Sequence, residues 1–250
     1  MKRLCAIAIA AFASAQALAV GNLADISVTD RDTGETLQVY RHRGDYWVAG
    51  RPGARYAIDI RNQGSTRLMA VTSVDGVNVI TGESAGYGQS GYVFDAWARY
   101  DIAGWRKSNE QIAAFTFTSV QRSYAARTGR PENVGVIGVA LFRERTYPPI
   151  AMAQGSPATP ARAEASAADE READRKDAAA GLGTGHGQRE TSVVVNVNFE
   201  REHPQPNEVI RIRYDSRENL LAMGVIRQPT PPRRPQAFPG EQQLGYVPDP

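Results

Sequence analysis

The amino-acid sequence predicts an all-β fold: a β-sandwich, immunoglobulin-like or related, with a small C-terminal β-hairpin and a short helix docked on it. Three observations support this class. Apolar and polar residues alternate with a period close to two from about Asp25 to Arg145. Turn-forming residues interrupt the alternation about every ten residues. Helical spacing of apolar residues is nearly absent, and many short strands with few helices are typical of sandwiches and barrels.

The strands of this first region are predicted one after another along the chain. They cover residues 25–30, 37–40, 46–48, 55–61, 67–74, 77–80, 91–94, 99–102, 115–120 and 134–142. Asp75-Gly76 lies between two of them and is a strong signal for a two-residue hairpin turn. One short helix is predicted from Asn109 to Ala113, with Ser108 as its N-cap and Gln111 placed to complete a capping box.

Changes in composition divide the chain into further segments. A sandwich domain is expected over residues 20–147, followed by a low-complexity linker over residues 148–190 that is rich in Ala, Pro, Glu and Gly. A second structured patch is expected over residues 191–226. The last residues, 227–250, are Pro-rich and are expected to form a disordered tail.

The second patch contains two alternating runs, which predict a hairpin between Ser192–Phe199 and Glu208–Tyr214. Asp215 is expected to cap a helix from Ser216 to Met223, which Gly224 would end. Two strands and two helical turns cannot bury a core of their own. We therefore expect this patch to dock on the sandwich, either adding strands to its sheet or covering an edge.

The first residues have the pattern of a secretory signal peptide. Lys2 and Arg3 precede a short apolar run, and Ala17-Leu18-Ala19 is the small-residue site that a signal peptidase reads. Cleavage is expected after Ala19, with a second possible cut after Ala17. The apolar run is too short and too rich in alanine to span a membrane. The sequence thus predicts a periplasmic or secreted protein with no transmembrane span in the mature chain.

Removal of the signal peptide changes the charge and the thiol content. The whole chain has 29 basic and 27 acidic residues and one cysteine, Cys5. The signal peptide takes away two basic residues and the cysteine, so the mature chain has 27 of each charge and no thiol. A net charge near zero gives no sign of a nucleic-acid partner, and a chain without thiols has neither disulfides nor thiolate metal sites.

The sequence contains few residues that could bind a metal ion. His42, His186 and His203 are far apart and form none of the short spacings that hold a metal ion. We expect neither a metal nor another cofactor.

Several short motifs occur together in this chain. They are Ile60-Arg-Asn62, Ser73-Val-Asp-Gly-Val-Asn-Val79, Gly91-Tyr-Val-Phe94, Ile102-Ala-Gly-Trp-Arg106, Ala114-Phe-Thr-Phe117, Gly135-Val-Ile-Gly-Val-Ala140, Gly181-Leu-Gly-Thr-Gly-His-Gly187, Glu208-Val-Ile and Tyr214-Asp-Ser-Arg-Glu-Asn-Leu220. With these motifs the chain resembles a family of exported, uncharacterised proteobacterial proteins. The resemblance covers most of residues 55–145 and 181–226. It implies that these separated segments belong together, and it carries no activity or catalytic residue.

The alternative to a binding or structural protein is a serine hydrolase. Gly82-Glu-Ser-Ala-Gly86 fits the G-x-S-x-G motif, and His186 follows with acidic residues between, in the order that α/β-hydrolases use. Ser84 would be the nucleophile and His186 the base. That motif requires a strand before the serine and a helix after it, whereas Tyr87-Gly88-Gln89 predicts a loop. A glycine-rich loop between two β-strands is therefore the preferred interpretation.

The same loop satisfies the G-x-G-x-x-G pattern of dinucleotide sites from Gly86 to Gly91, but without the helix that such a site needs. Glycine-rich loops can still bind ligands, and Tyr87 and Tyr92 would offer aromatic surface to a sugar or a peptide.

Trp97 and Arg106 extend this candidate ligand-binding set. Trp105, beside Arg106, is predicted to anchor the core, because large aromatic side chains dominate cores; a surface site is the alternative. From these observations we expect an exported, non-enzymatic protein with a binding or structural role in the cell envelope. Its partner would be an envelope protein or a cell-wall glycan, and the alternative is the periplasmic hydrolase.

Overall fold

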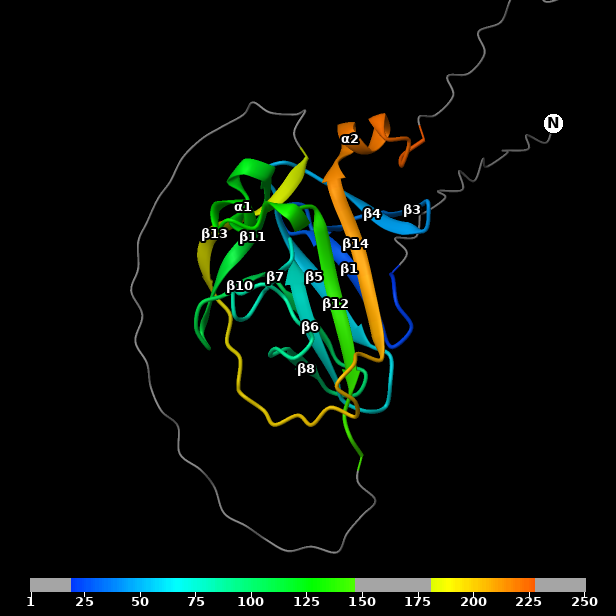
Figure 1. Ribbon diagram of the computed structural model, residues 1–250, viewed down its shortest axis with the longest axis vertical. Coiled ribbons are helices and arrows are strands. Elements are labelled where there is room, and N and C mark those ends of the chain that lie inside the picture. Colours follow the sequence, from blue (N-terminus) through cyan, green and yellow to red (C-terminus); the bar gives the residue numbers. More distant parts are fainter. Residues whose placement is uncertain (1–18, 147–180, 228–250) are drawn as a thin grey trace, which may run out of the picture.

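The chain folds into two β-sheets packed against each other (Figure 1). The computed structural model describes residues 19–146 and 181–227. Most of the predicted signal peptide, the linker up to residue 180 and the tail from residue 228 lie outside the described residues. The prediction of an all-β sandwich with a short helix is confirmed.

The first sheet, sheet A, follows the order β10-β11-β5-β1-β2, with β13 paired to β11 and β9 paired to β5, all antiparallel. Its strands are β1 (Ala24–Asp30), β2 (Glu35–Thr36), β5 (Arg55–Asn62), β9 (Arg99–Ile102), β10 (Gly104–Arg106), β11 (Gln111–Ser119) and β13 (Leu182–Thr191).

The second sheet, sheet B, follows the order β3-β4-β14-β12-β6-β7, with β8 paired to β6. Its strands are β3 (Val39–His42), β4 (Asp45–Gly50), β6 (Leu68–Val74), β7 (Val77–Asn78), β8 (Tyr92–Phe94), β12 (Val136–Arg143) and β14 (Glu208–Ser216). The pair β14–β4 is parallel, and β14 lies inside the sheet between β4 and β12.

Alternating residues build the core between the sheets. In β1 every second residue is buried, as the period of two predicts for a strand with one face inward. Aromatic rings from both sheets meet at the centre: Tyr56 stacks on Phe117 with ring centroids 4.2 Å apart, and Phe117 lies 5.4 Å from Tyr214. Trp105 is 3% exposed and packs edge-on against Phe115, so it belongs to the core as predicted.

The turn at Asp75-Gly76 joins β6 and β7 with φ values of 53° and 74°. Both values lie in the left-handed region that this two-residue turn requires, and Asp and Gly tolerate it. The hairpin predicted at this position is confirmed.

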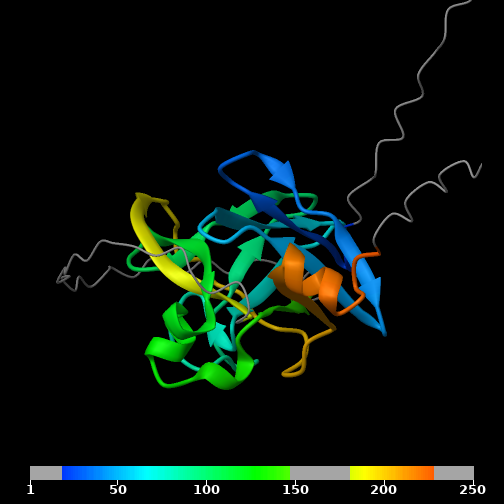
Figure 2. The same cartoon turned by 90° about the horizontal axis from the view of Figure 1, so that it is seen from above.

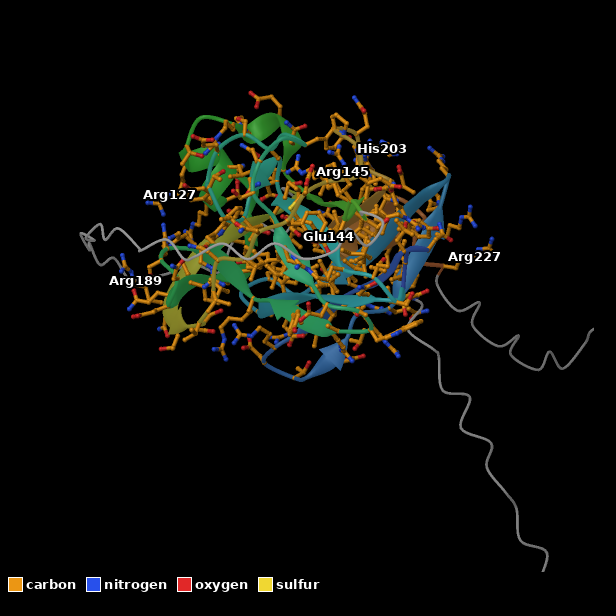
Figure 3. All side chains as sticks on the ribbon, turned by 90° about the horizontal axis from the view of Figure 1, so that it is seen from below. Arg127, Glu144, Arg145, Arg189, His203 and Arg227 are labelled. Atoms are coloured by element: carbon orange, nitrogen blue, oxygen red, sulfur yellow. The ribbon has the colours of Figure 1, made fainter. Side chains whose placement is uncertain are left out.

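Short helices lie at the ends of the sheets. They are η1 (Val120–Arg122), α1 (Tyr124–Arg127), η2 (Pro131–Asn133) and α2 (Arg217–Ala222). Seen from above, β13 and α2 lie on opposite sides of the molecule (Figure 2). Side chains fill the space between the sheets, and charged groups such as those of Arg127, Arg189 and Arg227 extend outward (Figure 3). None of the helices described is long and apolar enough to cross a membrane.

The predicted helix at residues 109–113 is wrong, because Gln111 already begins β11. Lys107 N and Ser108 N both donate to Gln111 O, which closes a turn between β10 and β11. The Ser108 hydroxyl accepts from Glu110 N within this turn rather than capping a helix. Ile112 and Ala113 are both buried in the sandwich, so tertiary packing overrides the local capping signal.

The predicted hairpin between Ser192–Phe199 and Glu208–Tyr214 is also wrong in its pairing. β14 pairs with β12 and β4 instead, and residues 192–199 are extended without forming a strand. Leu182–Thr191, nearly all of it expected within the linker, forms β13 and pairs with β11. This strand is rich in glycine and so shows no alternation of apolar and polar side chains in the sequence. Glycine is required at Gly183, because a Cβ there would lie 2.6 Å from Ser123 Cβ.

The second patch docks by adding one strand, β14, to sheet B, which confirms the first of the two docking modes expected. Its helix α2 is capped by Ser216, whose hydroxyl accepts from Asn219 N, and not by Asp215. Asp215 instead accepts from Asn219 Nδ2 and from Leu182 N, the first residue of β13. Gly224 ends the helix with φ of 71°, as predicted.

Candidate functional site

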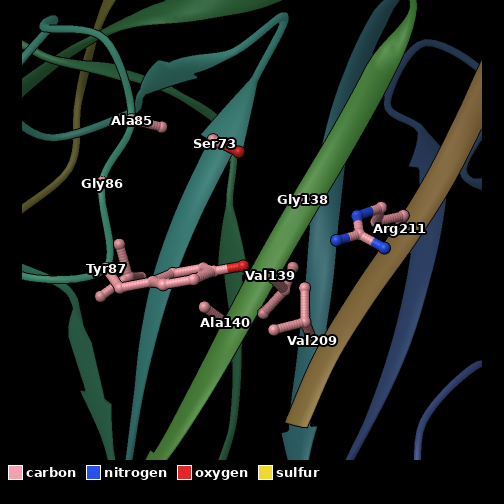
Figure 4. A pocket seen from close by; sticks show the side chains of 10 residues that line it. Ser73, Ala85, Gly86, Tyr87, Gly138, Val139, Ala140, Val209 and Arg211 are labelled. Carbon is pink, nitrogen blue, oxygen red and sulfur yellow. The ribbon is translucent and has the colours of Figure 1, made fainter. Parts of the chain in front are cut away.

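A groove runs over the outer face of sheet B. It has a volume of about 410 Å³ and is lined by Val71, Ser73, Ala85, Gly86, Tyr87, Gly138, Val139, Ala140, Val209 and Arg211. We call it the sheet B groove. Its floor comes from β6, β12 and β14, and its wall comes from the loop between β7 and β8 (Figure 4).

The strand register arranges the floor in two rows. Ser73, Gly138 and Arg211 lie side by side on β6, β12 and β14. The next row, two residues along each strand, is formed by Val71, Ala140 and Val209. Because Gly138 has no side chain, the Ser73 hydroxyl can lie close to its backbone in the middle of the first row. A Cβ at this position would lie 2.7 Å from Ser73 Oγ.

Two polar side chains face each other across the floor. The Tyr87 hydroxyl reaches across β6 toward β12, and the Arg211 guanidinium reaches from β14 toward Gly138 (Figure 4). Tyr87 is 49% exposed. Among the described residues, neither the Tyr87 hydroxyl nor the Arg211 guanidinium has a hydrogen-bond or ion-pair partner. Both groups are therefore available to a ligand in the groove.

Arg201 holds the wall of the groove in place. Its guanidinium donates to Tyr87 O and Gln89 O, and it lies 4.4 Å from the centre of the Phe142 ring. Burial lowers the pKa of this guanidinium. A single arginine thus ties the glycine-rich loop to the face of sheet B, which fixes Tyr87 over the floor.

Two apolar clusters cover other parts of this face of sheet B. At one end, Phe199 packs against an apolar cluster that includes Met69 and Phe142. At the other end, Leu220 of α2 packs against Trp47. The groove is the part of the face between these two covers.

The four predicted ligand-binding residues do not form one site. Only Tyr87 lines the groove. Tyr92 is half-buried, and its hydroxyl accepts from Arg106 Nε at 3.1 Å. The Arg106 guanidinium also donates to Ser192 O and Oγ, so it fastens the extended segment after β13. Trp97 is 61% exposed in the turn before β9 and lines no part of the groove.

Sequence reasoning missed Gly138, Arg201 and Arg211. For Arg211 a signal was present, because Glu208–Tyr214 alternates and so places the arginines on the face opposite to Ile210 and Ile212. For Gly138 and Arg201 there was none, since their neighbours come from distant parts of the chain.

Ser84 and His186 lie on different sheets. Ser84 forms an isolated bridge with Val77 at the edge of sheet B, and a loop rather than a helix follows it. His186 belongs to β13 in sheet A, where burial and then the charges of Lys107 and Arg189 lower the pKa of its imidazole. No hydrogen bond joins the two side chains within residues 19–146 and 181–227. Gly86–Gly91 leads into β8, so the helix of a dinucleotide site does not follow it.

A buried polar network links the two sheets. Asp75 accepts from Gly135 N at 2.9 Å, from Thr184 N at 2.8 Å and from the Tyr214 hydroxyl. The Thr184 hydroxyl lies 2.7 Å from that of Tyr214 and 2.6 Å from that of Tyr56. Since Tyr214 donates to Asp75, Thr184 donates to Tyr214 and Tyr56 donates to Thr184. Burial raises the pKa of Asp75 to about 6, although these hydrogen bonds oppose the rise.

A carboxylate pair lies on the outer face of sheet A. Asp59 and Asp101 are opposite each other on β5 and β9. The hydrogen bond with Asp59 raises the pKa of Asp101. Burial opposes ionisation of Asp59, but hydrogen bonds from Asp101, Thr29 and Arg99 lower its pKa. Each carboxyl therefore changes the ionisation of the other. The part of the chain that the structure covers contains no group of three or more His, Cys, Asp or Glu side chains placed to hold a metal ion.

Comparisons of this chain with protein-family models, with curated proteins and with solved structures find no match. The groove and its residues are therefore interpreted from their own geometry.

Proposed function

We propose that this protein is an exported, non-enzymatic binding protein of the cell envelope, and that the sheet B groove holds its ligand. The observation that carries the proposal is the pair of facing groups, the Tyr87 hydroxyl and the Arg211 guanidinium, in a groove whose floor has only backbone at Gly138. Ligand sites are typically concave and mostly apolar, with a few convergent polar groups. The groove combines these properties in one place.

Export rests on the signal-peptide pattern of residues 1–19. Cleavage after Ala19 is compatible with the fold that follows it. Val20 is buried, and its backbone nitrogen donates to Ile26 O at 2.9 Å. A new ammonium group at Val20 keeps this hydrogen bond, because it still carries N–H donors. N-terminal sequencing of protein from the periplasmic fraction should begin at Val20. Unprocessed protein in the cytoplasm would contradict export.

Binding is tested by blocking the groove. The mature protein is incubated with molecules below 1 kDa extracted from cell envelopes, and retained species are measured by native mass spectrometry. Val209→Trp fills the floor from an exposed position on the sheet, where a larger side chain leaves the core intact. The matched control is Val193→Trp, since Val193 is 70% exposed and lies outside the groove.

We expect a retained species with the wild-type protein and with Val193→Trp, and its loss with Val209→Trp. Equal retention by all three proteins, or retention by none, would contradict a ligand site in the groove. Circular dichroism and thermal melting of each variant verify that the fold is unchanged.

A further inference from the structure

We infer that the ligand of the sheet B groove is a small monocarboxylic acid with an apolar body, whose carboxylate is bound by Arg211. This inference rests on the proposed function and narrows it to one chemical class. It departs from the envelope protein or cell-wall glycan expected from the sequence.

The positive charge of Arg211 in the groove favours an anionic ligand. Arg211 is the one charged residue among the ten that line the groove, and none of them is acidic. The nearest acid along β14, Glu208, faces away and accepts from Asn22 N and Leu23 N. A second cation, Arg201, lies under the wall and has backbone carbonyls as its hydrogen-bond acceptors. An anion entering the groove therefore meets uncompensated positive charge.

The shape of the Arg211 site suits a carboxylate. A guanidinium offers parallel N–H donors that match the two oxygens of a carboxylate. Gly138 adds no side chain between Arg211 and Ser73, and the Ser73 hydroxyl lies close to the Gly138 backbone on the other side. A carboxylate placed over Gly138 is within reach of donors from both flanking strands.

The aliphatic row of the floor favours a ligand whose remaining part is apolar. Val71, Ala140 and Val209 form the row next to Ser73, Gly138 and Arg211, about 7 Å further along the strands. The row carries only aliphatic side chains, and the Tyr87 ring stands at its side (Figure 4). Sugars need many hydrogen-bonding partners, and this row supplies none. An alkyl chain or an aromatic ring is the better complement.

The size of the groove agrees with a small molecule. Its volume of about 410 Å³ is at the lower end of the range for ligand pockets, roughly 300–1,000 Å³. An acid with a body of several carbon atoms covers the aliphatic row and places its carboxylate over Gly138.

The test compares three probes on the full mature protein by NMR chemical-shift titration. Octanoate carries both features of the proposed ligand. 1-Octanol has the same apolar body without the charge, and N-acetylmuramate has a carboxylate on a sugar body. The variant Arg211→Gln removes the charge from an exposed side chain with no partner among the described residues. Arg213→Gln is the control, because Arg213 lies on the same face of β14 outside the groove.

We expect octanoate to shift the resonances of groove residues and to bind about tenfold or more tightly than either other probe. Arg211→Gln should weaken octanoate binding by about tenfold or more, and Arg213→Gln should leave it unchanged within about twofold. If 1-octanol bound as tightly as octanoate, the inference that Arg211 binds the carboxylate of the ligand would be wrong. If N-acetylmuramate bound more tightly than octanoate, the inference that the ligand has an apolar body would be wrong.

Either of these two results overturns the ligand class but leaves the groove as a binding site. If no probe shifts the groove resonances, the inference fails, and the retention experiment with Val209→Trp decides separately whether the proposed function also fails. The comparison of probes on the wild-type protein does not depend on how any variant folds.

Discussion

Replacing Asp75 by asparagine should change how the stability of the fold depends on pH. The Asp75 carboxyl is 1% exposed and lies between the two sheets. Its φ of 53° is tolerated by asparagine, so the turn at this position can keep its shape. The substitution removes one titrating group and leaves the other ionisable residues in place.

The size of the effect follows from the pKa. Burial raises the pKa of Asp75 from 3.8 to about 6 in the folded protein. The difference of about two pH units, at about 1.4 kcal/mol each, corresponds to about 3 kcal/mol of unfolding free energy. Because the folded pKa is the higher one, the stabilising contribution is fully present below about pH 3.8 and is lost as the pH rises through about 6.

The assay is urea unfolding followed by tryptophan fluorescence from pH 4 to pH 7.5, with the wild type and Asp75→Asn compared at each pH. At pH 4 the buried Asp75 carboxyl is protonated and, like the asparagine amide, has one acceptor oxygen and one donor group, so the two proteins should have similar stability there. The free energy of unfolding of the wild type minus that of the variant should then fall by about 2.4 kcal/mol between pH 4 and pH 7.

Ionisable groups that both proteins contain contribute equally to the two free energies of unfolding, so they cancel in the difference between wild type and variant. The control is Asp95→Asn, which removes an exposed carboxylate and should leave the pH dependence as in the wild type. A difference between wild type and Asp75→Asn that stays constant with pH, or that grows as the pH rises, would refute the reasoning.

Four other outcomes are expected. A chain ending at Arg145 lacks β13 and the interior strand β14, so it should show no cooperative thermal transition; a sharp transition near that of the full chain would contradict this. Trp105→Ala should lower the free energy of unfolding in urea by about 3–5 kcal/mol, because it removes a core aromatic residue; a loss below 1 kcal/mol would favour the surface role. Asp101→Asn should raise the melting temperature at pH 7, since it removes a negative charge directly opposite Asp59 on the paired strand; a lower melting temperature would argue against repulsion between the two carboxyls. A fluorophosphonate probe should leave the folded protein unlabelled, because a loop follows Ser84; labelling that disappears in Ser84→Ala would support the hydrolase.

The sequence predicted those parts of the candidate site that depend on local pattern. The glycine-rich loop and the exposure of Tyr87 follow from composition and turn residues. Arg106 and Tyr92 were grouped with Tyr87 because they are near in sequence or alike in chemistry, yet they bond to each other and to Ser192. Proximity along the chain does not indicate which strand a side chain lies beside.

Alternation and turn residues by themselves determined the fold class, most strands before residue 145 and the hairpin at Asp75-Gly76, because both are properties of neighbouring residues. Only the tertiary structure decided the pairing of β13 and β14. β13 is rich in glycine, which has no side chain to reveal a buried face, and β14 finds its partners about 70 and 170 residues away. The groove depends on that pairing, since Arg211 reaches Gly138 and Ser73 only when β14 lies beside β12. The sequence determined which residues face outward, and the strand order decided which of them meet.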